Sequence, residues 1–222
     1  MTQLVAVDGD RSGLGLWCLD SLAPRLAAHA GVQGLMVNLA QDNPLPELYP
    51  GESLQGDDFD VIVQSWVSSR AEWLDALEPI AGELSKRCAR RFDYRVDDFT
   101  VKNDETALSR AYPTAGYKLM RGLVFHSDLA PAAARRQWAH HAKLAVRVHV
   151  GVARYTQHWV EEVLSPGAPA IGGFSDLHFP SLEAMRDRYF VSSHGKEEIL
   201  HDIGHFIASG SKRFYGQEYL VK

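Results

Sequence analysis

The sequence predicts an α+β fold in which a β-α-β-β-α-β order of elements occurs twice along the 222 residues. Strands and helices follow one another in this order in both halves. A helix-to-strand junction of the form His-x-Gly-Val recurs at 29–32 and 149–152. A polar segment that contains Pro113 separates the halves. Each unit has the ferredoxin-like arrangement, which places both helices on one face of an antiparallel sheet.

Apolar periodicity defines the elements of the first half. Trp73, Leu77, Ile80 and Leu84 recur at helical spacing, which predicts a helix around them. The expected strands are 4–7, 32–40, 59–66 and 92–102, and the expected helices are 16–30 and 69–86.

The second half repeats the pattern. Pro131 suits the first position of a helix, because the N–H that proline lacks would be unpaired there. Residues 192–195 (Ser-Ser-His-Gly) interrupt the second helical stretch. The expected strands are 118–125, 150–160, 173–179 and 213–221, and the expected helices are 131–147 and 181–208.

These elements divide the chain into a repeat over 1–102, a linker over 103–116 and a second repeat over 117–222. In each repeat the helices cover one face of the sheet, and the other face also needs cover. If the two sheets pack face to face, each sheet covers the open face of the other. We therefore expect an intramolecular α+β barrel with an enclosed interior.

Charge and composition exclude several classes of partner. The chain has 23 Lys and Arg against 28 Asp and Glu, a formal net charge of −5, which argues against a nucleic-acid-binding protein. No apolar run approaches the roughly 20 residues of a membrane helix, and the first residues lack the pattern of a signal peptide. We expect a cytoplasmic protein that binds neither nucleic acid nor membranes.

The second half contains a group of residues with a familiar spacing: Trp138, His141, Gly151, Tyr155, Asp202, Phe206, Glu218 and Tyr219. In these residues, and over about residues 117–222, it resembles the EthD-like family of the dimeric α+β barrel superfamily. The first half matches only in the order of its elements. The resemblance implies a barrel around a small-molecule cavity, in a superfamily that includes cofactor-free cyclases, lyases, monooxygenases and haem-degrading enzymes. It therefore implies a fold rather than one reaction.

Most of the ten histidines lie after residue 125, and histidine can act as an acid or a base near neutral pH. Alternation along the hairpin of 150–160 and 173–179 gives one face five polar side chains directed into the barrel. With the loop centred near Gly167, His158 is expected opposite Asp176. The five polar residues are Arg154, Thr156, His158, Asp176 and His178, with Thr156 opposite His178.

Three further residues are candidates for the site. His141 lies on the helix stripe that faces the sheet, and the resemblance gives it a family position. Tyr155 also has a family position, but alternation places it on the helix-covered face, so the two expectations for this phenol donor conflict. His126, at the end of a strand, is expected to border the cavity. For each histidine, a packing or solvated role is the alternative.

The functional hypothesis is an acid/base enzyme that needs no cofactor or metal. It would be a dehydratase, cyclase or C–C lyase acting on a small apolar aromatic or polyketide-like compound. His158, oriented by Asp176, would remove a proton, His141 or His178 would donate one, and Arg154 would stabilise an enolate. Thr156, Tyr155 and His126 would contact the substrate.

Two alternatives come from other classes. One is a non-catalytic small-molecule-binding protein, and the other is a haem- or metal-dependent oxidative enzyme. The sequence also leaves open whether the two-repeat unit forms a homodimer.

Overall fold

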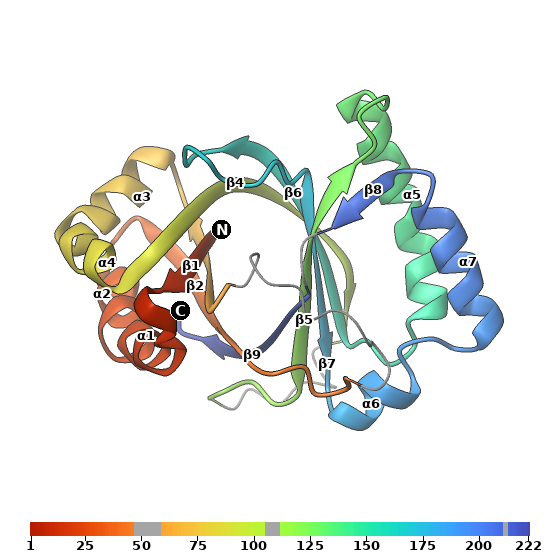
Figure 1. Cartoon of the computed structure of the whole chain (residues 1–222), viewed down its shortest axis with the longest axis horizontal. Coiled ribbons are helices and arrows are strands. Elements are labelled where there is room, and N and C mark those ends of the chain that lie inside the picture. The colour runs from red at the N-terminus through yellow and green to blue at the C-terminus, as the bar shows by residue number, and fades with distance from the viewer. Residues whose placement is uncertain (47–58, 105–111, 211–212) are drawn as a thin grey trace.

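The computed structural model describes residues 1–46, 59–104, 112–210 and 213–222. These residues form a nine-stranded antiparallel sheet in the order β7-β6-β4-β1-β3-β2-β9-β5-β8, and an additional pairing of β7 with β5 closes it into a barrel. Strand β8 extends the sheet outside the closed ring. Helices α1–α4 cover one flank of the barrel, and α5 and α7 cover the opposite flank (Figure 1).

Two helices of the first half, α1 and α3, begin at side-chain caps. The Asp10 carboxylate accepts a hydrogen bond from the Gly13 N–H, and the Ser69 hydroxyl accepts one from the Glu72 N–H. The elements are β1 (Thr2–Ala6), α1 (Arg11–Trp17), α2 (Ala23–Ala28), β2 (Val32–Ala40), β3 (Val61–Val67), α3 (Arg70–Leu77), α4 (Ala81–Arg87) and β4 (Cys88–Asn103).

The second half has one long helix and two shorter ones. Pro131 is the first residue of the long helix, as its fixed φ and missing N–H favour. The elements are β5 (Tyr117–Phe125), α5 (Pro131–Val148), β6 (Arg154–Val163), β7 (Gly173–Phe179), α6 (Leu182–Asp187), α7 (Ser193–Ile203), β8 (Ile207–Gly210) and β9 (Phe214–Leu220).

The strand order confirms the predicted fold class. The first repeat has the order β4-β1-β3-β2, and the second has the equivalent order β9-β5-β7-β6. The repeats join where β4 pairs with β6 and where β2 pairs with β9. The exact division into 1–102, 103–116 and 117–222 stays a prediction, and 105–111 of the expected linker lie outside the described residues.

Some predicted boundaries were wrong. The first helix begins at Arg11 rather than at residue 16, and a π-helical segment, Cys18–Leu22, divides it. Strand β6 begins at Arg154 rather than at residue 150. Residue Gly151 instead lies in a turn where its N–H donates to the Arg188 carbonyl, so close to the Ala184 carbonyl that a Cβ would overlap with it.

Other boundaries moved for local reasons. A 3-10 segment, Glu78–Ile80, divides the predicted helix 69–86 at Pro79. The helix break predicted at 192–195 already ends at Ser192, and α7 begins at Ser193. The Ser192 hydroxyl caps this helix by accepting a hydrogen bond from the Gly195 N–H. The last residues of the predicted helix 181–208 belong to strand β8.

Apolar side chains fill the space between the sheet and the helices on both flanks. One core includes Leu4, Leu26 and Trp73, and the other includes Leu177 and Phe179. None of the described helices is both long and apolar enough to cross a membrane. Because the helix-facing sides of the sheet carry the main cores, the barrel interior can take polar side chains.

The barrel interior has an apolar layer and a polar layer. In the apolar layer the rings of Tyr94 and Phe174 pack edge to face, with centroids 5.2 Å apart, beside Ile62, Met120 and Phe214. The polar layer contains His158, Asp176 and His178 among other buried groups. The interior is therefore largely filled, and the polar layer is where it can carry chemistry.

Candidate functional site

A buried ammonium lies at the centre of the polar layer. Lys118 Nζ lies 2.9 Å from Asp176 Oδ2 and 2.8 Å from Glu218 Oε2, and its side chain is fully buried. Burial by itself would raise the pKa of both carboxyls. The charge of Lys118 outweighs that effect and holds the pKa of Asp176 and of Glu218 far below the ordinary values.

His158 lies between two carboxylates. Its Nδ1 is 2.6 Å from Asp98 Oδ1, and its Nε2 is 3.2 Å from Asp176 Oδ2. Burial by itself would lower the pKa of His158, but the hydrogen bonds and charges of Asp176 and Asp98 raise it above the ordinary value. These contacts favour the imidazolium form, in which both ring nitrogens can donate.

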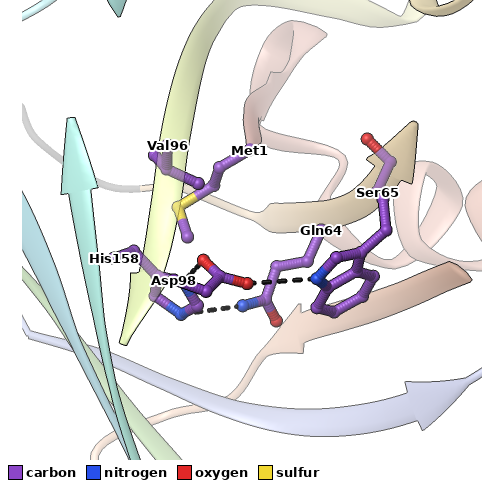
Figure 2. Close-up of a pocket in the computed structure, with 7 residues that line it drawn as sticks. Met1, Gln64, Ser65, Val96, Asp98 and His158 are labelled. Carbon is purple, nitrogen blue, oxygen red and sulfur yellow. Dashed lines mark hydrogen bonds and ion pairs between the residues drawn. The ribbon is translucent and has the colours of Figure 1, made fainter. Parts of the chain in front are cut away.

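The amide of Gln64 connects His158 to the lysine. Its Oε1 accepts hydrogen bonds from Lys118 Nζ and Asn38 Nδ2, each 3.0 Å long. This fixes the amide so that Nε2 donates to Asp176 Oδ2 at 3.1 Å. Figure 2 shows Asp98 at one nitrogen of the His158 ring and the Gln64 amide nitrogen at the other, Nε2, at 3.1 Å.

A small cavity of about 50 Å³ adjoins His158. Its size suits one or two water molecules rather than an organic substrate. The Trp66 indole Nε1 donates to Asp98 Oδ2 at 3.1 Å, on the side away from His158. The cavity is lined by Met1, Gln64, Ser65, Trp66, Val96, Asp98 and His158.

The other predicted barrel residues extend the same network. Arg154 pairs with Glu218. His178 Nε2 donates to the Ala115 carbonyl at 3.0 Å, and its Nδ1 lies 3.4 Å from Arg154 Nη2. Thr156 is half-buried on the same strand. The network thus joins side chains from both repeats.

The predicted hairpin register was wrong by two residues. His158 pairs with Phe174 rather than Asp176, Thr156 pairs with Asp176, and Arg154 pairs with His178. The observed pairs centre the hairpin near Pro166 instead of Gly167, and a change of one residue in the centre shifts each pair by two residues. A shift of two residues preserves the faces, so the five polar side chains keep the predicted side of the sheet.

A second and larger cavity lies on the opposite face of this sheet, beneath α5 and α7. Its volume is about 120 Å³. Its lining is mainly apolar and aromatic, with a few polar side chains. The lining residues are Leu119, Arg121, Leu123, Trp138, His141, His149, Tyr155, Ser175, Leu177, Tyr189, Phe190, Ile199, Leu200, Ile203, Ile207 and Arg213.

His141 enters this cavity from α5. Its Nδ1 lies 2.6 Å from Asp202 Oδ2 on α7, and its ring packs against Phe206 with centroids 5.6 Å apart. Burial lowers the pKa of His141, and Asp202 opposes the shift without reversing it. A neutral ring that donates from Nδ1 to Asp202 keeps the lone pair on Nε2.

Tyr155 lines the same cavity from β6. Its hydroxyl oxygen accepts from Gln157 Nε2 at 3.2 Å, and burial raises the pKa of the phenol to about 12. The phenol therefore keeps its proton at neutral pH. Tyr155 lies on the helix-covered face of the sheet, as alternation predicts. This face contains a cavity that His141 also lines, so the two expectations for Tyr155 no longer conflict.

His149 lies at the end of α5 in the same cavity. Its Nδ1 donates to the Tyr189 carbonyl at 2.8 Å, and the two rings stack with centroids 4.7 Å apart. Burial lowers the pKa of His149 to about 4. The cavity thus holds two imidazoles that are neutral at pH 7.

The sequence-predicted residues therefore fall into two groups on opposite faces of the β6–β7 sheet. The barrel holds Arg154, Thr156, His158, Asp176 and His178, and the helix-side cavity holds His141 and Tyr155. His126 borders neither of the two cavities. Its Nε2 donates instead to the Gly204 carbonyl after α7, at 3.0 Å.

Sequence reasoning missed several residues of both sites. In the barrel these are Lys118, Gln64 and Asp98, for which the lysine within an apolar strand was the available signal, and Glu218, which had entered only through the resemblance. In the helix-side cavity they are His149 and the carboxylate of Asp202, which had entered only through the resemblance.

No family model and no curated protein matches the sequence. An anthrone oxidase-like protein matches with TM-score 0.56 and 10% identity, over 100% of this chain and 89% of its own. A monooxygenase-like protein from Fusobacterium nucleatum matches with TM-score 0.57 and 7% identity, over 100% and 90%. A mutant chlorite dismutase from Candidatus Nitrospira defluvii matches with TM-score 0.54 and 11% identity, over 99% and 89%. At these identities the likeness shows the shared dimeric α+β barrel fold.

Replacing Lys118 by methionine is expected to destabilise the protein by about 3–5 kcal/mol, because Asp176 and Glu218 would stay buried without their shared cation. Urea unfolding followed by circular dichroism measures the change. Lys143→Met, at an exposed position of α5, is the matched control. Equal midpoints for the two variants would contradict a central role of Lys118.

The low pKa of His149 predicts a loss of stability in acid. Between about pH 6.5 and pH 4 the unfolded chain binds a proton at this residue that the folded chain does not bind. The free energy of unfolding should therefore fall by up to about 1.4 kcal/mol per pH unit from this group as the pH falls. Urea titrations at several pH values should give a shallower slope for His149→Gln than for the unmodified chain. Parallel slopes would contradict the assignment.

Proposed function

We propose that the protein is an enzyme that moves protons on a small ring compound bound in the helix-side cavity, with His141 as the base. The observation that carries the proposal is the contact of His141 Nδ1 with Asp202 in a cavity large enough for a ligand. A carboxylate that fixes the tautomer of a neutral imidazole is the usual arrangement of an oriented base.

The proposed chemistry uses two polar groups of the cavity lining, His141 and Tyr155. His141 Nε2 accepts a proton from a carbon next to a carbonyl group, and Asp202 stabilises the imidazolium that forms. The negative charge moves to the carbonyl oxygen. The protonated phenol of Tyr155 can donate a hydrogen bond to that oxygen, because the Tyr155 oxygen already accepts from Gln157. His141 can later return the proton in a dehydration, cyclisation or C–C cleavage.

The cavity limits the size and polarity of the substrate. A volume of about 120 Å³ is close to that of cavities that bind benzene, roughly 150 Å³. Aromatic rings such as Trp138 and Phe190 line it. We infer a compact, largely apolar ring compound.

Likeness to other proteins supports a small-molecule enzyme. Three of the residues that carry the EthD-like resemblance, Trp138, His141 and Tyr155, line this cavity, and two others, Asp202 and Phe206, contact His141. The structural neighbours described as anthrone oxidase-like and monooxygenase-like suggest oxidation of ring compounds in proteins of this fold. Proton removal from carbon is a reasonable first step for oxidation as well as for a lyase.

The barrel site fits the role of base less well. Both nitrogens of His158 contact carboxylates, and its raised pKa favours the protonated form. The adjoining cavity of about 50 Å³ is too small for a ring. In this proposal His158, Asp176 and His178 stabilise the barrel, together with Arg154.

A haem would fit the described cavity poorly. An axial ligand of the right chemistry is present, because a histidine held by a carboxylate suits iron as well as it suits a proton. However, a volume of about 120 Å³ corresponds to roughly one ring, and the haem macrocycle is several times larger. The side chains as they lie here therefore favour chemistry on a small ring.

Hydrogen–deuterium exchange on 2-indanone, a compact ring ketone with acidic C–H bonds, tests the proposal. The protein should speed exchange in D₂O, measured by proton NMR, and His141→Ala should lower the protein-catalysed rate by about 10²–10⁴-fold. His140→Ala is the matched control, because this neighbouring histidine is exposed. Catalysis that survives in His141→Ala would contradict the assignment of the base. Binding of 2-indanone without any exchange would favour the non-catalytic alternative.

The pH dependence of the same exchange distinguishes the two histidines. The base must be neutral, so the lowered pKa of His141 predicts that the rate at pH 6.5 stays close to its value at pH 8 and falls at lower pH. The raised pKa of His158 would instead reduce the rate already above pH 6.5. A midpoint above pH 6.5 would therefore favour the barrel site.

A further inference from the structure

Two exposed histidines at the end of α7 face one another. His201 Nε2 and His205 Nε2 lie 3.4 Å apart, and the rings are nearly perpendicular, at 84°. The pair spans the last turn of α7 and the 3-10 turn after it, where the His205 N–H donates to the Asp202 carbonyl at 3.1 Å. The spacing His-x-x-x-His places both side chains on one side of a helix end.

We propose that His201 and His205 chelate a divalent transition-metal ion, with Zn²⁺ as the ion to test first. Zinc binds imidazole nitrogens at about 2.0–2.1 Å in tetrahedral geometry, which separates two ligand nitrogens by about 3.3–3.4 Å. The observed separation of 3.4 Å matches that value. As a neutral hydrogen bond between two imidazoles, the same distance would be long.

The surroundings leave room for the rest of the coordination sphere. His205 borders an open groove on the outer face of α5 and α7, with a volume of about 390 Å³. Among the described residues no three histidine, cysteine or carboxylate side chains come together as a metal cluster. Water would therefore complete the coordination, and the ion would exchange readily. The groove is lined by Arg136, Gln137, His140, Asp202, His205 and Phe206.

The position of the pair connects it to the helix-side cavity. The residues between the two histidines include Asp202, which contacts His141 Nδ1, and Gly204, whose carbonyl accepts from His126. Phe206, the next residue, packs on the ring of His141. An ion bound by both imidazoles would hold this turn in the conformation that places Asp202 against His141. The metal site itself does not depend on the proposed reaction.

Isothermal titration of the full chain with ZnCl₂, after removal of metals and without a histidine tag, tests the site. One ion per chain is expected, and His201→Gln and His205→Gln should each weaken binding by about tenfold or more, because a single imidazole remains. His194→Gln, at an exposed position at the start of α7, is the matched control and should bind as the unmodified chain does. MgCl₂ should not bind, because Mg²⁺ prefers oxygen ligands.

Thermal unfolding gives a second measurement. Zinc that binds the folded chain should raise the melting temperature, and the increase should be lost in both His201→Gln and His205→Gln. Because both positions are exposed, these variants should fold, which circular dichroism confirms. Absence of binding, or binding that persists in both variants, would overturn the proposal. Two-dimensional NMR of the imidazoles would show the same result residue by residue.

Discussion

The ion network around Lys118 is the interaction on which the barrel depends. Its ammonium, on β5, contacts Asp176 on β7, Glu218 on β9 and the Gln64 amide on β3. An unpaired ammonium at this depth would be very unfavourable, so the strands that carry its partners must stay together. Because β3 belongs to the first repeat and the other strands to the second, the network joins the two halves as well as filling the space between them.

The repeats are related by pseudo-symmetry, and the polar layer shows where they differ. At one junction of the repeats, His158 on β6 lies opposite Asp98 on β4. At the equivalent position of the other junction, Asn38 on β2 lies opposite Glu218 on β9. The first repeat therefore contributes a neutral amide where the second contributes an imidazole. That amide donates to Gln64, whose oxygen accepts from Lys118. The first repeat is thus a partner that orients charged groups of the second.

Alternation along the strands was enough to predict the fold and the faces, but not the contacts. A register error of two residues left Arg154 and His158 on the correct side, because side-chain direction repeats every two residues. Lys118 could not be placed from sequence, since its partners lie 54, 58 and 100 residues away. The helix-side cavity was missed because a helix-covered sheet face was expected to be completely packed.

The β6–β7 sheet separates two histidine environments of opposite character. On the barrel side, two carboxylates overcome the effect of burial and raise the pKa of the His158 imidazole. On the helix side, burial dominates, and His141 stays neutral although a carboxylate contacts it. The difference follows from the number of carboxylates that each ring meets, two at His158 and one at His141. A charged ring with both nitrogens bonded stabilises structure, whereas a neutral ring with one nitrogen directed to a cavity can accept a proton. This physical distinction is the reason why we propose that the barrel residues stabilise structure and that the chemistry takes place beneath α5 and α7.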